Sequence, residues 1–276
     1  VLAAVGQIDT NLRGAIERGE FEAHAQAQVS LGHGRVVGFE VLSRWRHPRR
    51  GFVPPVEFIP IAEATGQIRD LGAWILDEAC GRLAAWLAAA EDRRLSVNLS
   101  PVELRDPGYV RNFADTIARH GVEAGRVTLE VTESVFLKAD ATRAHRTLGE
   151  LRELGVRLAL DDFGTGYSSL AYLSRLPFGE LKIDRLFVAD IDRDAGKRKL
   201  LEGVVGLGRG IGLTLVAEGA ERPGEVQLLA ELGVDAVQGF VFAKPVPCVS
   251  RGRGSCRARP RPRTRPRPEP PPHIPG

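Results

Sequence analysis

The sequence predicts an α/β fold closed into a barrel of about eight strands. From residue 95 onward, short apolar segments alternate with longer segments of helical periodicity, a pattern typical of parallel strands joined by helices. About eight such strands within about 230 residues favour a closed barrel over an open sheet. In addition, almost every predicted strand ends in a polar residue, as expected where barrel strands carry a site at their carboxyl ends.

The chain before residue 95 follows a different pattern. The predicted elements are a short amphipathic helix over residues 9–19, strands over 21–31 and 35–45 joined by a Gly-His-Gly turn, a short helix over 54–66 and a long helix over 67–90. The apolar residues of the long helix recur at helical spacing, which indicates a core-facing stripe rather than a site.

The remaining elements continue the alternation. Strands are predicted over residues 95–100, 126–132, 156–162, 180–184, 213–219 and 234–240. Helices are predicted over residues 102–119, 140–154, 194–209 and 223–232, with a short helix after the glycine-rich segment that follows residue 162.

The segment GVRLALDDFGTGYSSL, residues 155–170, stands out within this pattern. A buried strand ends in two adjacent carboxylates, Asp161 and Asp162, and a loop rich in glycine and serine follows. Neighbouring strand residues point to opposite faces, but at a strand end both acids can reach one centre, and paired carboxylates suit a hard divalent cation. An Asx turn that caps a helix explains the same residues, so this segment alone leaves both interpretations open.

Polar residues at the ends of the other strands favour the metal interpretation. They are Glu40, Asn98, Glu130, Asp161 with Asp162, Lys182, Glu218 and Gln238. Individually they have ordinary explanations, such as an edge-strand charge for Glu40, a helix N-cap for Asn98 or a solvated strand end for Lys182. In a barrel they converge at one mouth. Carboxylates, an amide oxygen and one lysine are typical of a divalent-metal site that acts on phosphate, whereas the few scattered histidines do not indicate a zinc hydrolase.

Composition narrows the classes of function further. The net charge of +3 is misleading, because residues 251–276 contain eight Arg and one Glu and leave the rest of the chain at −4. A nucleic-acid-binding function is therefore not indicated for the folded part. No apolar run approaches the about 18 residues of a membrane span. The cysteines, Cys80, Cys248 and Cys256, suggest neither a disulfide framework nor a zinc site, and a reducing cytoplasm is the simplest setting.

Three segments are expected. Residues 1–19 are predicted to be a helical linker from an upstream domain, and residues 20–247 the barrel. Residues 248–276 are rich in Arg and Pro without apolar periodicity, and we expect this tail to be disordered. Its abrupt change in composition suggests a reading-frame change or another artefact in the coding sequence.

Seven motifs carry a family resemblance. They are EVLSRW at 40–45, NLS at 98–100, EVTES at 130–134, DDFGTGYSSL at 161–170, LKIDR at 181–185, AEGAE at 217–221 and QGF at 238–240. Together they resemble the EAL-domain cyclic-di-GMP phosphodiesterases, in order and over residues 20–247. The resemblance implies a modified TIM (β/α)8 barrel whose first strand is antiparallel to the others, in agreement with the predicted hairpin. The signature tripeptide is Glu-Val-Leu rather than Glu-Ala-Leu, a change compatible with activity.

The resemblance also implies a two-metal site that hydrolyses cyclic di-GMP to linear pGpG. One Mg²⁺ or Mn²⁺ ion would be held by Glu40, Asn98, Glu130 and Asp161, and a second by Asp161, Asp162 and Glu218. Two such ions lower the pKa of a bridging water and brace the attacking and leaving oxygens. Lys182 would position that water or offset charge on the phosphate, and the catalytic residues would be Glu40, Asp162, Lys182 and Glu218. Ca²⁺, with its longer and looser coordination, is expected to inhibit.

Further roles follow from the same resemblance. The residues expected to bind substrate are Gln26, Leu42, Arg44, Glu221 and Gln238, with the Arg44 guanidinium on a phosphate. Glu133 would anchor the glycine loop, Phe163 to Ser169, and residues 162–172 would contribute to a homodimer interface. Asp184 is expected to be structural. The resemblance further implies an upstream regulatory domain, with no membrane span and no nucleic-acid partner for this segment.

Two alternatives to an active phosphodiesterase remain open. A receptor domain would bind cyclic di-GMP without turnover, and a scaffold would act through protein contacts alone. Degenerate members of the family lose metal ligands or the lysine, and this sequence retains all of them. The complete set favours the enzyme.

Overall fold

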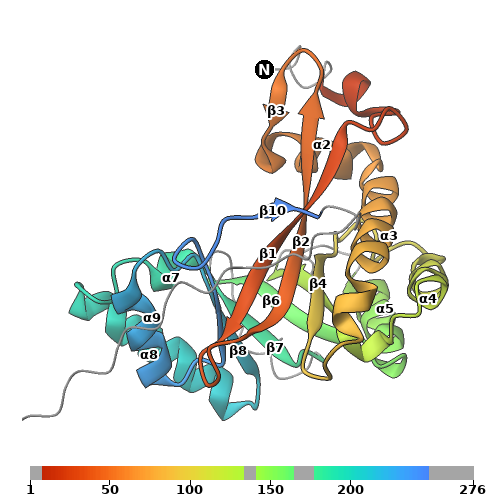
Figure 1. The fold of residues 1–276 in the computed structure, drawn as a ribbon. Coiled ribbons are helices and arrows are strands. Elements are labelled where there is room, and N and C mark those ends of the chain that lie inside the picture. The colour runs from red at the N-terminus through yellow and green to blue at the C-terminus, as the bar shows by residue number, and fades with distance from the viewer. Residues whose placement is uncertain (1–7, 134–140, 165–176, 249–276) are drawn as a thin grey trace, which may run out of the picture.

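A closed barrel forms the centre of the protein (Figure 1). The computed structural model describes residues 8–133, 141–164 and 177–248. Its barrel consists of β1 (Phe21–Ser30), β2 (Val36–His47), β4 (Arg94–Asn98), β5 (Val127–Thr132), β6 (Arg157–Phe163), β7 (Glu180–Ile183), β8 (Thr214–Glu218) and β9 (Ala236–Gln238). Neighbouring strands from β2 to β9 are parallel. β1 closes the barrel by pairing antiparallel to both β2 and β9, which confirms the predicted fold class.

Two short strands extend the sheet beyond the prediction. β3 (Gly51–Val53) pairs antiparallel to the end of β2, and β10 (Val246–Pro247) pairs antiparallel to β1. β3 contains Gly51 and β10 contains Pro247, and both residue types are depleted in strands.

Helices surround the barrel at most of the predicted places. They are α2 (Pro55–Thr65), α3 (Ile68–Leu87), α4 (Tyr109–Arg119), α5 (Ala141–Glu153), α7 (Arg185–Val188), α8 (Ala195–Gly210) and α9 (Pro223–Leu232), with a 3-10 turn over Ala124–Arg126. None of the helices within the described ranges is long and apolar enough to cross a membrane. The one-turn helix α7 was not predicted.

Two predicted helices have the wrong bounds. The helix predicted over 102–119 begins only at Tyr109, because Asp106 accepts a hydrogen bond from the Gly108 amide at 2.8 Å and Pro107 disfavours helical geometry in the residue before it. Within the described residues, which begin at residue 8, the helix predicted over 9–19 ends at Leu12. Turns follow it, and Gly14 has a left-handed backbone with φ of 69°. The predicted tail lies outside the described residues except for Cys248.

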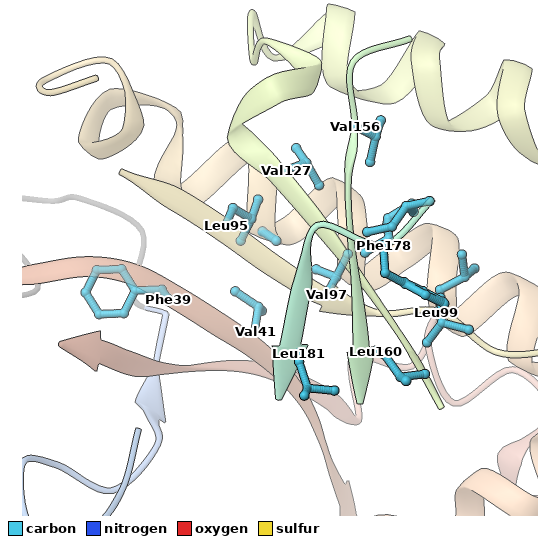
Figure 2. Packing of buried hydrophobic residues seen from close by; sticks show 14 of the residues in the cluster. Phe39, Val41, Leu95, Val97, Leu99, Val127, Val156, Leu160, Phe178 and Leu181 are labelled. Carbon is cyan, nitrogen blue, oxygen red and sulfur yellow. The ribbon is translucent and has the colours of Figure 1, made fainter. Parts of the chain in front are cut away.

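Strand alternation separates an apolar outer face from a polar interior. Leu95, Val97 and Val41 belong to the hydrophobic core between the strands and their covering helices (Figure 2). Because successive strand residues point to opposite faces, Ser96 and Asn98 are directed to the barrel interior. The interior can therefore carry polar groups without interrupting the core.

A second hydrophobic cluster lies where the β1–β2 hairpin extends beyond the barrel. Trp45 is fully buried there, stacked on Phe21 with ring centroids 5.8 Å apart and in edge contact with Phe58. Its indole Nε1 donates to Glu20 Oε2 at 2.9 Å. This cluster attaches α2 and the start of α3 to the hairpin.

We expect Trp45→Ala to lower the free energy of unfolding by about 3 to 5 kcal/mol, because it leaves a large cavity in this cluster. Phe52→Ala is the matched control: Phe52 lies opposite Arg46 in the β2–β3 pair and is 54% exposed, so a change within about 0.5 kcal/mol is expected. Urea denaturation measures both. Equal losses would contradict the packing described.

Candidate active site at the carboxyl ends of the barrel strands

Strand register brings the predicted polar residues to one level of the barrel. Asn98 pairs with Glu130 across β4 and β5, and Glu218 pairs with Gln238 across β8 and β9. On the antiparallel side, Gln26 pairs with Glu40. The residues predicted from strand ends therefore converge, although they are far apart in sequence.

Lys182 lies at the centre of this group and is 1% exposed. Its Nζ is 2.5 Å from Glu130 Oε2 and 2.6 Å from Glu218 Oε1. Asp161 Oδ1 and Glu40 Oε2 follow at 3.3 Å and 3.6 Å. One ammonium thus faces four acidic side chains, so the centre holds more acids than cations.

Two amide side chains hold Glu40. Asn98 Nδ2 donates to Glu40 Oε1 at 2.9 Å, and Gln238 Nε2 donates to Glu40 Oε2 at 2.5 Å. Gln238 Nε2 also reaches Gln26 Oε1 at 3.2 Å, and Gln26 Nε2 donates to the Ala243 carbonyl at 3.4 Å. These contacts fix the orientation of the Glu40 carboxylate.

Burial and crowding shift the acidities of the centre in different directions. Burial raises the pKa of Glu40, but Lys182 and the hydrogen bonds from Gln238 and Asn98 outweigh it and hold that pKa below its ordinary value. Burial and the neighbouring Glu40 charge raise the pKa of Glu130 well above its ordinary range. Burial raises the pKa of Glu218 to about 8 although Lys182 opposes it.

The carboxylates act on Lys182 in turn. Burial lowers the pKa of the Lys182 ammonium, but Glu130, Glu218 and the two other acids outweigh it and raise the pKa well above its ordinary value. Lys182 is therefore a permanent cation at the centre of the barrel mouth.

Asp162 differs from its neighbour Asp161 in backbone and environment. It adopts a left-handed backbone with φ of 55°, and its amide donates to Asp161 Oδ1 at 3.0 Å. Burial, followed by the Asp161 charge, raises the pKa of Asp162 to about 6. Next to it, the Gly164 amide donates to Glu133 Oε1 at 3.0 Å. Glu133 thus contacts the start of the glycine loop; its role as an anchor stays a prediction, and loop residues 165–172 lie outside the described residues.

A cavity of about 290 Å³ opens beside the carboxylate group. Leu42 and Arg44 line it together with Asn98 and Glu130. Arg44 is half-buried, and burial lowers the pKa of its guanidinium although Glu40 opposes this. Of its guanidinium nitrogens, Nη1 donates to the Ser43 carbonyl at 3.0 Å. Two predicted substrate contacts therefore border a cavity that adjoins the charged centre.

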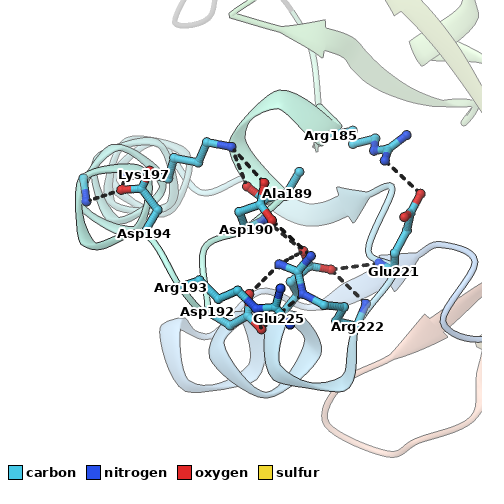
Figure 3. Close-up of polar contacts among 11 residues, drawn as sticks. Arg185, Ala189, Asp190, Asp192, Arg193, Asp194, Lys197, Glu221, Arg222 and Glu225 are labelled. Carbon is cyan, nitrogen blue, oxygen red and sulfur yellow. Dashed lines mark hydrogen bonds and ion pairs between the residues drawn. The ribbon is translucent and has the colours of Figure 1, made fainter.

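Glu221 does not join the charged centre among the described residues. Its carboxylate pairs with Arg185 at 2.9 Å and is 41% exposed (Figure 3). Its backbone amide donates to the buried Glu225, at 2.8 Å. Asp184 accepts the Leu186 amide at 2.8 Å and caps α7, a structural role of the expected kind.

Residues 9–245 match the family model of the EAL domain. This chain belongs to the EAL-domain family. The bifunctional diguanylate cyclase/cyclic di-GMP phosphodiesterase MucR of Pseudomonas aeruginosa is similar, with 40% identity over 242 residues that make up 87% of this chain and 35% of MucR. The chain spans about a third of the length of the curated relatives it matches.

Solved EAL structures resemble this fold closely. The MucR phosphodiesterase in complex with c-di-GMP has a TM-score of 0.81 and 40% identity, with 87% of this chain and 98% of that chain covered. The EAL enzyme Bd1971 with bound cAMP and cyclic di-GMP has a TM-score of 0.83 and 32% identity, over 88% of this chain and 67% of the other. The resemblance deduced from the motifs is confirmed.

The donor chemistry of this EAL domain fits a hard divalent cation, although the side chains close around Lys182. No three His, Cys, Asp or Glu side chains in the described part of the chain are arranged as a ready-formed metal site. However, Glu130 Oε1 and Gln238 Oε1 are buried oxygens without a hydrogen-bond partner among the described residues. Carboxylate and amide oxygens are ligands that Mg²⁺ and Mn²⁺ accept. The predicted metal ligands stay predictions.

Three residues behind Asn98 were not predicted. Ser100 Oγ donates to Glu63 Oε1 at 2.7 Å, and the Ser100 amide donates to Glu103 Oε2 at 3.0 Å. Glu63 and Glu103 also line the 290 Å³ cavity. The spacing Ser-x-x-Glu is the sequence signal of a capping box and could have revealed the second contact, but nothing in the sequence indicates that Glu63 lies nearby.

We expect Lys182→Met to lower the free energy of unfolding by about 3 to 5 kcal/mol, because it leaves buried carboxylates without their cation. Lys199→Met, on the exposed surface of α8, should change it by less than about 0.5 kcal/mol. Chemical denaturation in the absence of divalent metal makes the measurement. An unaltered Lys182→Met midpoint would show that the ammonium does not balance these acids.

Glu103→Gln should raise stability increasingly as the pH rises. Burial raises the pKa of Glu103 to about 8, so the folded wild type keeps a proton that the unfolded chain releases above its ordinary pKa. The wild type therefore loses stability between about pH 4.5 and 8, and Gln does not titrate. The stability difference should grow by about 5 kcal/mol over that range. Urea denaturation at several pH values tests this, with exposed Glu202→Gln as a pH-independent control; a flat difference for Glu103→Gln would refute it.

Proposed function

We propose that this EAL domain is a phosphodiesterase that hydrolyses cyclic di-GMP to linear pGpG with Mg²⁺ or Mn²⁺. The observation that carries the proposal is the group of four carboxylates around Lys182, beside a cavity lined by Arg44. The MucR and Bd1971 structures, whose titles name bound c-di-GMP, support the substrate.

The proposed metal ligands are Glu40, Asn98, Glu130 and Asp161 for one ion and Asp161, Asp162 and Glu218 for a second. When bound, such ions acidify a water and stabilise charge on the phosphate. The amides of Asn98 and Gln238 hold Glu40 in one orientation before any ligand arrives. Ca²⁺ is proposed to inhibit, because it coordinates at longer distances and with looser geometry.

The chain's own residues supply binding and charge balance. Arg44, which lines the cavity with Leu42, would hold a phosphate oxygen, and guanidinium groups match that geometry. Lys182, fixed among the acids, would offset negative charge that develops as the attacking oxygen bonds to phosphorus. Gln26, Gln238 and Glu221 are proposed to contact the nucleotide, which for Glu221 requires release of its Arg185 pair.

The bond changes follow from the product. A water oxygen forms a bond to phosphorus and the P–O3′ bond breaks, so pGpG keeps a 5′-phosphate and gains a 3′-hydroxyl. The attacking water loses a proton and the leaving oxygen gains one. Asp162 and Glu218 are partly exposed, whereas the Glu130 side chain is 0% exposed. Asp162 and Glu218 are therefore better placed than Glu130 to exchange the protons of the water and the leaving oxygen with solvent.

The context of the domain is also proposed. The chain covers about a third of its curated relatives, so an upstream regulatory domain and a homodimer through residues 162–172 are inferred from the family alone. The same holds for the location, which is the cytoplasm, or the cytoplasmic side of the inner membrane if the full-length protein is membrane-anchored.

The purified chain should convert cyclic di-GMP to pGpG in Mn²⁺, and Glu40→Ala should lower the rate by at least about 100-fold, because the held carboxylate is lost. Chromatography of the nucleotides measures this, with Glu202→Gln as the control on the exposed surface of α8. Mn²⁺ should also raise the melting temperature of the wild type more than that of Glu40→Ala. Binding of cyclic di-GMP without any product would indicate a receptor domain and contradict the proposal.

A further inference from the structure

A second cavity of about 240 Å³ lies between α3 and α4. One face of α4 contributes Tyr109, Phe113 and Thr116, which recur at helical spacing. From α3 come Ala73 and Leu76. Both helices cover the outside of the barrel, side by side (Figure 1). This cavity therefore lies away from the carboxylate group around Lys182.

The wall between the two cavities is formed by Gly72 and Glu103, which line both. The Glu103 carboxylate lies directly over Gly72, where a Cβ atom would meet Glu103 Oε1 at 1.9 Å. Only a glycine leaves room for the carboxylate at this point of α3.

Glu103 is a buried acid without a counter-ion. It is 4% exposed, its Oε2 accepts the Ser100 amide, and its Oε1 has no hydrogen-bond donor among the described residues. The neighbouring Arg69 pairs instead with Asp106 at 3.7 Å. Burial raises the pKa of Glu103 to about 8, as expected for a carboxyl group that lacks a cation.

The rest of the lining suits a flat ring. Tyr109 stacks on Phe113 with ring centroids 6.3 Å apart, and Leu76 adds apolar surface. Burial and the Glu103 charge raise the pKa of Tyr109 well above its ordinary value, so its hydroxyl keeps its proton. Asp70 and Asp106 also line the cavity. Three acids against the single Arg69 disfavour phosphates and other anions.

We propose that the second cavity binds a small planar organic cation, such as an amidinium or a protonated amino-heterocycle, with an N–H donor on Glu103 Oε1 and its ring against Phe113 and Tyr109. A charge-assisted hydrogen bond and cation–π contact with the aromatic rings supply the attraction. The volume is sufficient, because a cavity of about 150 Å³ already accommodates benzene. Glu103 also accepts the Ser100 amide, and Ser100 follows Asn98, the last residue of β4, by two positions. The proposed ligand would therefore bind to a residue that contacts the segment directly after Asn98.

Benzamidine is the probe, because it joins a flat ring to an amidinium. Titration of the ¹⁵N-labelled chain should give saturable NMR shifts at the amides of Tyr109, Asn112 and Thr116. Benzoate, of the same shape and opposite charge, should give none. Glu103→Gln should weaken benzamidine at least tenfold while it retains the Ser100 contact, since Gln also serves in a capping box. Asp115→Asn, which removes an exposed acid of α4, should bind like the wild type.

The outcomes separate clearly, and none depends on phosphodiesterase activity. Absence of saturable shifts, equal affinity of the wild type and Glu103→Gln, or equal binding of benzoate would each overturn the proposal. Shifts confined to Ser43 and Ile59, which line only the cavity beside the carboxylate group, would overturn it as well.

Discussion

The burial of Lys182 among four carboxylates is the constraint on which the site depends. Removing one of these charges from water costs several kcal/mol, and their mutual attraction offsets this only when the geometry is well defined. That geometry comes from the register of β2, β5, β6, β7 and β8. A shift of one residue in any of these strands would turn its acid or the lysine outward. The strand register therefore decides which charged side chains meet at the barrel mouth, and their attraction in turn favours that register.

The antiparallel β1 completes the arrangement. A strand that pairs antiparallel to both β2 and β9 closes the barrel and places Gln26 beside Glu40 and near Gln238. Gln238 can then donate to both of them. Lys182 and these hydrogen bonds lower the pKa of Glu40 against its own burial. The charged centre therefore contains one acid of lowered pKa, held in one orientation, beside acids of raised pKa. The antiparallel β1 thus gives Glu40 an environment different from that of the other acids.

The strand ends were predictable because alternation of apolar and polar residues reports the two faces of a barrel strand. β3 and β10 were not, since Gly51 and Pro247 within them are of residue types that are depleted in strands. The late start of α4 was signalled by Pro107 and was missed, whereas the side-chain contacts of Ser100, Glu103 and Asp106 that hold the preceding turn show no such signal. The pairing of Glu221 with Arg185 depends on how the loop after β8 meets α7, which no local pattern encodes.

Glu103 shows why a residue that opposes stability is informative. Gln at this position would accept the Ser100 amide equally well and would not titrate, so it would avoid the stability loss that the wild type undergoes as the pH rises. Instead the chain combines an acid at this position with a glycine in α3, although glycine in a helix interior costs about 1 kcal/mol relative to alanine. The buried acid and the helical glycine both lower stability, and they meet at the wall between two cavities. Folding alone therefore does not explain them. Such conflicts are typical of functional positions, and a buried acid kept where an amide would serve for folding fits a cationic ligand whose binding would favour the ionised form of Glu103.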